Sequence, residues 1–125
     1  MEQSKSFRQT ALVVEDDELL RDLISTLLEE SDYDVIECES AEAAELVLNR
    51  NGSCISLMLT DVQLAGHMTG IELARRAVQR VPSMSVLITS GRSLPEELPA
   101  GTSFLPKPWA PLDLLRYTEN IARNH

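Results

Sequence analysis

Polar side chains suited to phosphate or metal chemistry follow four short apolar segments of this chain. Three acids, Glu15 to Asp17, come directly after the first of these segments, and Asp61 follows another, "CISLMLT". Thr89 ends the next segment, and Lys107 stands between two prolines after the last. Carboxylates that converge on one place repel one another unless a cation lies among them. A ligand set made only of oxygen favours Mg²⁺ over softer metals.

Lys107 suits such a cluster, because a lysine ammonium is a compact charge that matches a single phosphoryl oxygen. The only other lysine is Lys5, and every remaining base is an arginine. The peptide between Lys107 and Pro108 is a candidate cis bond, which would fix the direction of the lysine stem. With the hydroxyl of Thr89, these groups indicate phosphoryl transfer onto the carboxylate of Asp61. Such a reaction needs mostly positioning and charge neutralisation.

The sequence around these groups predicts alternating strands and helices. Short aliphatic runs predict strands at residues 10–15, 34–39, 54–60, 84–90 and 102–106. Apolar residues at helical spacing predict helices at residues 19–30, 41–50, 70–81 and 111–123. This alternation implies right-handed crossovers and an α/β fold, with a parallel sheet covered on both faces. Ligands of such sheets bind at the carboxyl ends of the strands, where the polar groups stand.

Asp17 has two interpretations, as the N-cap of the first helix or as a further metal ligand. The cap is preferred, because aspartate is among the residues most favoured at that position.

Length and composition indicate one acidic domain. The 125 residues suffice for a single domain, which we expect over residues 10–123 after a disordered lead over residues 1–9. The net charge of −9 argues against binding nucleic acid or an anionic membrane through bulk charge. The chain has no long apolar run and no secretory signal pattern, so we expect a cytoplasmic protein. Cys38 and Cys54 lack metal-binding spacing and are expected to be buried free thiols.

Four segments, in this order, resemble the receiver domain of response regulators in two-component signalling, including the chemotaxis regulators. They are "LVVEDDELLRDLI", "LMLTDVQLAGHMTGIELARR", "VLITSG" and "FLPKPW". The resemblance implies a flavodoxin-like, doubly wound sheet of five parallel strands in the order 2-1-3-4-5. Pro106 agrees with that order, because proline is tolerated within a sheet mainly on an edge strand.

The resemblance also implies a metal site and a phosphoacceptor. Asp61 would accept a phosphoryl group from a histidine of a sensor kinase or of a histidine phosphotransfer protein. Asp16 would bind Mg²⁺ directly, Glu15 would bind it through water, and Gln63 would contribute its backbone carbonyl.

Three further roles follow from the same resemblance. Thr89 and Lys107 would bind the phosphoryl group, and Thr89 with Phe104 would form the conformational switch. Such a domain assists its own phosphorylation and dephosphorylation but turns over no free metabolite, so it is not an enzyme in the usual sense. We expect a monomer or a weak dimer.

Two connections depart from the usual receiver pattern. The loop from Asp61 to Gly70 is one residue longer, and Ala65 stands where proline is usual. The connection over residues 91–101, "GRSLPEELPAG", is short and holds two prolines. We expect a shortened fourth helix of at most one turn there, high mobility, and ordering on phosphorylation. The kinase should then dock on the first helix and the turn around Trp109.

Two alternative functions fit the same residues less well. A Mg²⁺-dependent aspartyl phosphohydrolase would normally carry a second acid two positions after its nucleophile, where Gln63 stands. An interaction module that is never phosphorylated would not need Asp61, Thr89 and Lys107 together. Whether the chain stands alone or is a receiver fragment of a hybrid histidine kinase stays open, as do the cognate kinase and the output.

Overall fold

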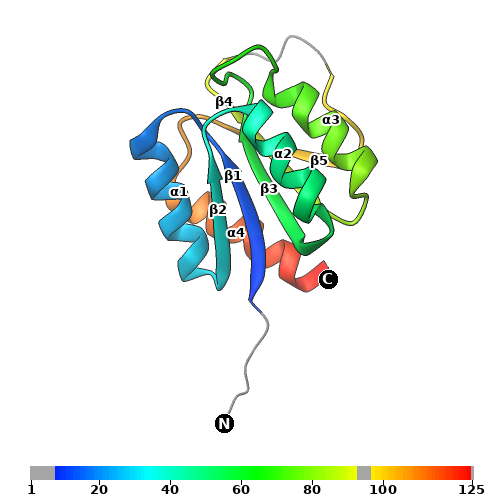
Figure 1. Ribbon diagram of the computed structural model, residues 1–125. Coiled ribbons are helices and arrows are strands. Elements are labelled where there is room, and N and C mark those ends of the chain that lie inside the picture. Colours follow the sequence, from blue (N-terminus) through cyan, green and yellow to red (C-terminus); the bar gives the residue numbers. More distant parts are fainter. Residues whose placement is uncertain (1–7, 93–96, 125) are drawn as a thin grey trace.

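The computed structural model describes residues 8–92 and 97–124, and this part of the chain contains five strands and four helices (Figure 1). The strands form one parallel sheet in the order β2-β1-β3-β4-β5. They are β1 (Gln9–Val14), β2 (Tyr33–Cys38), β3 (Ile55–Asp61), β4 (Ser85–Ser90) and β5 (Thr102–Pro106). The predicted fold class and strand order are confirmed, and Pro106 lies on an edge strand as expected.

The helices cover both faces of the sheet. They are α1 (Glu18–Glu30), α2 (Ala41–Asn51), α3 (Gly70–Arg80) and α4 (Pro111–Asn124), with a short 3₁₀ turn at Gly52–Cys54. Successive strand residues point to opposite faces. Leu12 therefore packs with the buried residues of α2 and α3, whereas Val13 packs with those of α1 and α4.

Local sequence signals fix where the helices begin. The Asp17 side chain accepts hydrogen bonds from the first-turn amides of α1, at Leu19 and Leu20, so its predicted N-cap role is confirmed. Thr69 caps α3 and forms a reciprocal capping box with Glu72. This cap sets the point at which the chain leaves the loop after β3 and enters the helix.

Two details at the ends of the sheet differ from the expectation. Strand β1 begins at Gln9, inside the expected lead, next to Arg8, whose side chain donates to Asp34 and to the carbonyl of Tyr33. Residues 1–7 lie outside the described part of the chain. The prediction that Cys54 is buried is wrong: this free thiol is exposed, because the chain makes a 3₁₀ turn before β3 begins. Cys38 is buried and free, as expected.

The connection between β4 and β5 is described only at residues 91–92 and 97–101, and these residues contain no helix. The expectation of at most one helical turn falls partly on residues 93–96, which lie outside the described part. Leu98 packs, partly buried, against the core on the side of α2 and α3. None of the helices described is long and apolar enough to cross a membrane.

Candidate metal and phosphoryl site

Three acids meet at the carboxyl ends of β1 and β3. Glu15, Asp16 and Asp61 each place a carboxylate oxygen so that the three oxygens lie within 4.8 Å of one another. Glu15 is only 1% exposed and Asp61 is 7% exposed, whereas Asp16 is open to solvent. The arrangement is thus a shallow site with a buried floor and one accessible carboxylate at its rim.

The turn after β1 holds Glu15 from two directions. Its Oε2 accepts a hydrogen bond from the backbone N–H of Asp17 at 3.0 Å. Its carbonyl accepts from the guanidinium of Arg21 at 2.8 Å, and the same guanidinium donates to Glu37. Burial raises the pKa of Glu15; the bond to the Asp17 amide opposes this rise, and the nearby Asp61 adds to it. The metal-free domain therefore holds a carboxyl group whose charged form is disfavoured.

Lys107, the residue after β5, extends its side chain toward the acids. Its Nζ lies 2.8 Å from Oδ2 of Asp61 and 3.5 Å from Oε1 of Glu15. The backbone N–H of Lys107 donates to the carbonyl of Ser90, and the peptide to Pro108 is cis, as predicted. Burial by itself would lower the pKa of Lys107, but the hydrogen bond and charge of Asp61 outweigh it, so the pKa is raised. The ammonium charge is therefore secure at neutral pH.

Thr89 lies beside the acids on β4. It is fully buried and is the register partner of Asp61 on the neighbouring strand. Its carbonyl accepts from the backbone N–H of Val62, and its hydroxyl accepts from Nε1 of Trp109 at 3.2 Å. Phe104, the expected switch aromatic, lies on β5 and packs, partly buried, against the core on the side of α3.

The loop after Asp61 is tied to α2 by a contact that the sequence did not predict. A carboxylate oxygen of Glu42 accepts hydrogen bonds from the consecutive backbone amides of His67 and Met68, at 3.1 and 3.0 Å. The bond from the Met68 amide is the largest of the causes that lower the pKa of Glu42. Gly66 sits in the left-handed region, with φ 92°, and a Cβ there would lie 2.5 Å from Glu42. This glycine and this acid therefore hold the loop, although Ala65 replaces the usual proline.

Gln63 follows Asp61 by two residues at the start of this loop. Its backbone N–H donates to Oδ1 of Asp61 at 3.4 Å, and its side chain is exposed. The side chains of the other predicted metal ligands, Glu15, Asp16 and Asp61, converge in the structure. The direction of the Gln63 carbonyl stays a prediction.

The donor set suits a hard divalent cation. Its three carboxylates come with one ammonium, Lys107, so the cluster has a formal charge of −2 when all four groups are ionised. No histidine or thiol belongs to the cluster found in the described part of the chain. Oxygen ligands and excess negative charge fit Mg²⁺, which retains several waters and shares its ligands with phosphate.

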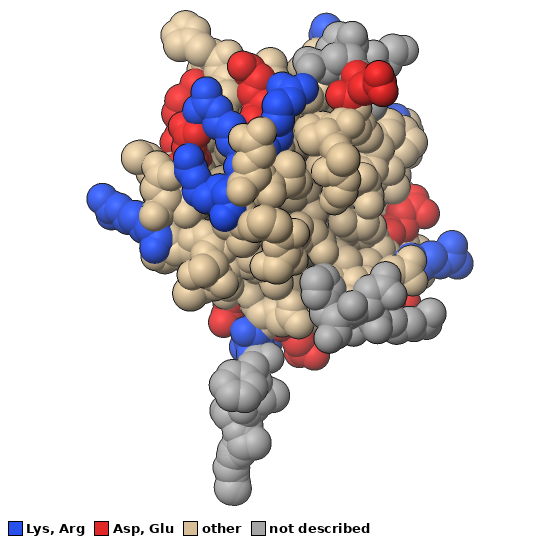
Figure 2. All heavy atoms as spheres, turned by 90° about the vertical axis from the view of Figure 1, so that its right-hand side faces the viewer, with Lys and Arg blue, Asp and Glu red and all other residues tan. Residues whose placement is uncertain are grey.

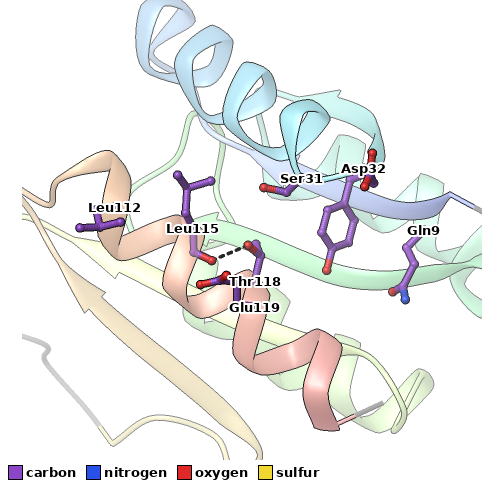
Figure 3. A pocket seen from close by; sticks show the side chains of 8 residues that line it. Gln9, Ser31, Asp32, Leu112, Leu115, Thr118 and Glu119 are labelled. Carbon is purple, nitrogen blue, oxygen red and sulfur yellow. Dashed lines mark hydrogen bonds between the residues drawn. The ribbon is translucent and has the colours of Figure 1, made fainter.

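A separate cavity of about 580 Å³ lies at the other end of the sheet, between α1 and α4 (Figure 3). It is lined by Gln9, Ser31, Asp32, Tyr33, Leu112, Leu115, Thr118 and Glu119. The hydroxyl of Thr118 donates a hydrogen bond to the carbonyl of Leu115. No residue of the acid cluster lines this cavity. It therefore offers no chemistry comparable to the site at the carboxyl ends.

Positive side chains on the face toward α3 stand next to acidic ones (Figure 2). Arg76 pairs with Glu45 of α2 at 2.6 Å, and Arg80 donates to Asn49. These two arginines therefore link α3 to α2.

Comparison with known proteins agrees with this geometry. A family model described as the response regulator receiver domain matches residues 11–119. The chain is 32% identical over 117 residues to a putative two-component response regulator, ARR21, of Arabidopsis thaliana, covering 91% of this chain and 19% of that protein. It is 30% identical over 115 residues to the response regulator receiver protein CpdR of Brucella abortus, covering 88% of this chain and 93% of that protein.

A solved structure shows the same architecture. The CheY-like response regulator receiver domain protein from Methanospirillum hungatei superimposes with a TM-score of 0.83 at 27% identity, covering 94% of this chain and 96% of that one. The chain spans only about a fifth of the length of the two Arabidopsis response regulators that it matches.

Proposed function

The chain belongs to the family of response regulator receiver domains, and we propose that it is a phosphoacceptor switch whose acceptor is Asp61. One observation carries the proposal: the Lys107 ammonium lies 2.8 Å from the Asp61 carboxylate, within the cluster that contains Glu15 and Asp16. A lone acid at a strand end needs no such partners. Together they supply a nucleophile, a phosphate-binding cation and a set of metal ligands.

In the proposed reaction, a carboxylate oxygen of Asp61 forms a bond to the phosphorus of a phosphohistidine. The bond from that phosphorus to the histidine nitrogen breaks, and the nitrogen leaves with the electron pair and takes up a proton. Lys107, already paired with Asp61, holds one oxygen of the transferred group, and the hydroxyl of Thr89 donates to another. These residues position and neutralise the group, which is the main requirement of phosphoryl transfer.

We propose that Glu15, Asp16 and Asp61 hold Mg²⁺, with the carbonyl of Gln63 as a further ligand. Bound Mg²⁺ would neutralise charge on the phosphoryl oxygens. The all-oxygen donor set and its excess negative charge support this assignment. Glu15 is buried and Asp16 is exposed; in the proposed site Asp16 binds the ion directly and Glu15 binds it through water.

The proposed partner is a histidine kinase or a phosphotransfer protein in the cytoplasm, docked on α1. Leu19 and Leu23 of α1, one helical turn apart, are 82% and 44% exposed. Leu19 lies only two residues beyond Asp17, so this apolar surface begins beside the acids. An apolar helix face of a partner placed there would bring its phosphohistidine to Asp61.

The test is phosphorylation by a small donor. Incubation with acetyl phosphate and Mg²⁺ should add one phosphate, seen by intact mass, and Asp61→Asn should abolish the addition because an amide is a poor nucleophile. Asp32→Asn is the matched control, since Asp32 is exposed, lies far from the cluster and has φ 70°, which asparagine tolerates. Undiminished phosphorylation of Asp61→Asn would refute the proposed function.

A further inference from the structure

Trp109 forms a hydrogen bond with a hydroxyl that the proposed reaction uses. Its Nε1 donates to Oγ1 of Thr89 at 3.2 Å. Thr89 is fully buried at the end of β4, whereas Trp109 follows β5 and packs, partly buried, against the core formed with α1 and α4. The bond therefore connects the segment that carries Lys107 with the strand end beside Asp61.

The direction of this bond is fixed by chemistry. An indole nitrogen only donates, whereas a threonine hydroxyl has one hydrogen to donate and two lone pairs to accept. Thr89 must therefore be the acceptor, and the hydrogen of its hydroxyl must turn away from Trp109. Thr89 and Asp61 are register partners on adjacent strands, so their side chains emerge on the same side of the sheet. The hydroxyl hydrogen is left to donate to a group on Asp61.

The backbone holds the indole in place on both sides. The N–H of Lys107 donates to the carbonyl of Ser90 at 2.9 Å, and the N–H of Ala110 donates to the carboxylate of Asp113 at 2.8 Å. Trp109 lies between these anchors. Its ring is thus presented by a fixed segment, which favours a defined orientation of the hydroxyl it contacts.

We propose that Trp109 is a positioning residue for phosphoryl recognition: its indole N–H orients the Thr89 hydroxyl as a donor toward a phosphoryl oxygen on Asp61. The proposal rests on the proposed function, because it assigns a role within the same site. Replacing the indole with a phenyl ring keeps an aromatic side chain but removes the N–H. Loss of one neutral hydrogen bond then corresponds to phosphorylation slower by about fivefold.

A double-mutant cycle tests this role. Phosphorylation by acetyl phosphate with Mg²⁺ is timed on phosphate-affinity gels for the unsubstituted chain, Trp109→Phe, Thr89→Val and the double variant. Trp109→Phe should slow the reaction about fivefold in the presence of Thr89. In the Thr89→Val background the same change should alter the rate by less than about twofold, because the hydroxyl through which Trp109 acts is gone.

The outcomes separate the positioning role from packing. An equal slowing in both backgrounds, or no slowing in either, would overturn the role of Trp109 while leaving Asp61 as the acceptor. Failure of the unsubstituted chain to become phosphorylated would instead refute the proposed function itself.

A second measurement keeps Trp109 intact, in case Trp109→Phe does not fold. The chain has a single tryptophan, so its indole N–H gives one resonance. Beryllofluoride, which mimics the phosphoryl group, should shift that resonance in the unsubstituted chain and leave it nearly unmoved in Thr89→Val. A shift of the same size in both proteins would contradict the proposal.

Discussion

Gly70 is the glycine with the least room for a side chain. It begins α3, and a Cβ placed on it would lie 1.8 Å from the carbonyl oxygen of Asp61 and 2.7 Å from the carbonyl carbon. Close carbon–oxygen contacts are normally about 3.3 Å or longer. Gly70→Ala therefore requires the start of α3 and the end of β3 to separate by about 1.5 Å.

The cost of this separation follows from what it breaks. The backbone N–H of Gly70 donates to the carbonyl of Val62 at 2.9 Å, and this bond would be lost or stretched. Overpacking costs about 1 to 3 kcal/mol, and the lost hydrogen bond adds about 1 kcal/mol. The better helix propensity of alanine offsets at most about 1 kcal/mol. We expect Gly70→Ala to lower the free energy of unfolding by about 3 kcal/mol.

The assay is urea unfolding followed by circular dichroism, with Gly91→Ala as the matched control. A Cβ on Gly91 would meet nothing closer than the Cβ of Lys107 at 3.8 Å, an ordinary contact. The control should change the free energy of unfolding by less than about 0.5 kcal/mol. If Gly70→Ala proved as stable as Gly91→Ala, the close approach of α3 to the acceptor's backbone would be wrong.

Three further predictions concern acidic residues in the site and in contact with its loop. Burial raises the pKa of Glu15 above its ordinary 4.5, so the folded state retains a proton that the unfolded state loses, and stability falls as pH rises through the folded pKa. Glu15→Gln should therefore raise the urea midpoint of the metal-free domain at pH 7. The difference from the unsubstituted chain should vanish below the ordinary pKa of glutamate. A difference of the same size at all pH values would contradict this prediction. Asp16→Ala should weaken Mg²⁺ binding, measured by calorimetry, by at least about tenfold, and unchanged affinity would show that the acidic pair is misassigned. Glu42→Ala should speed amide hydrogen exchange at His67 and Met68, because both amides lose their acceptor, and unaltered exchange there would show that Glu42 does not hold the loop.

The sequence was sufficient to predict that the polar residues at the strand ends lie together. In a parallel sheet the carboxyl ends of the strands share one edge, so Asp61, Thr89 and Lys107 could be brought together from the strand pattern alone. The capping role of Asp17 was likewise local, because it depends on amides only two and three residues away. Such short-range and topological rules need no knowledge of side-chain packing.

The contacts that the sequence did not predict depend on how side chains meet across the fold. Glu42 and His67 are 25 residues apart, and nothing in either segment marks them as partners. The bond from Trp109 to Thr89 needs the turn after β5 to place the indole over β4, which strand order does not specify. The apolar run that adjoins Cys54 predicts a strand there, but β3 begins one residue later, at Ile55, after a tight turn.

The most direct test of the central claim is to locate the phosphoryl group after reaction with acetyl phosphate and Mg²⁺. Borohydride reduces an acyl phosphate to an alcohol, so a phosphorylated aspartate becomes homoserine, which mass spectrometry of peptides identifies by position. Phosphorylation of Asp61 predicts homoserine at position 61, dependent on Mg²⁺ and absent from Asp61→Asn. Homoserine at position 16 or 17 instead, or none in a chain that carries phosphate, would contradict it.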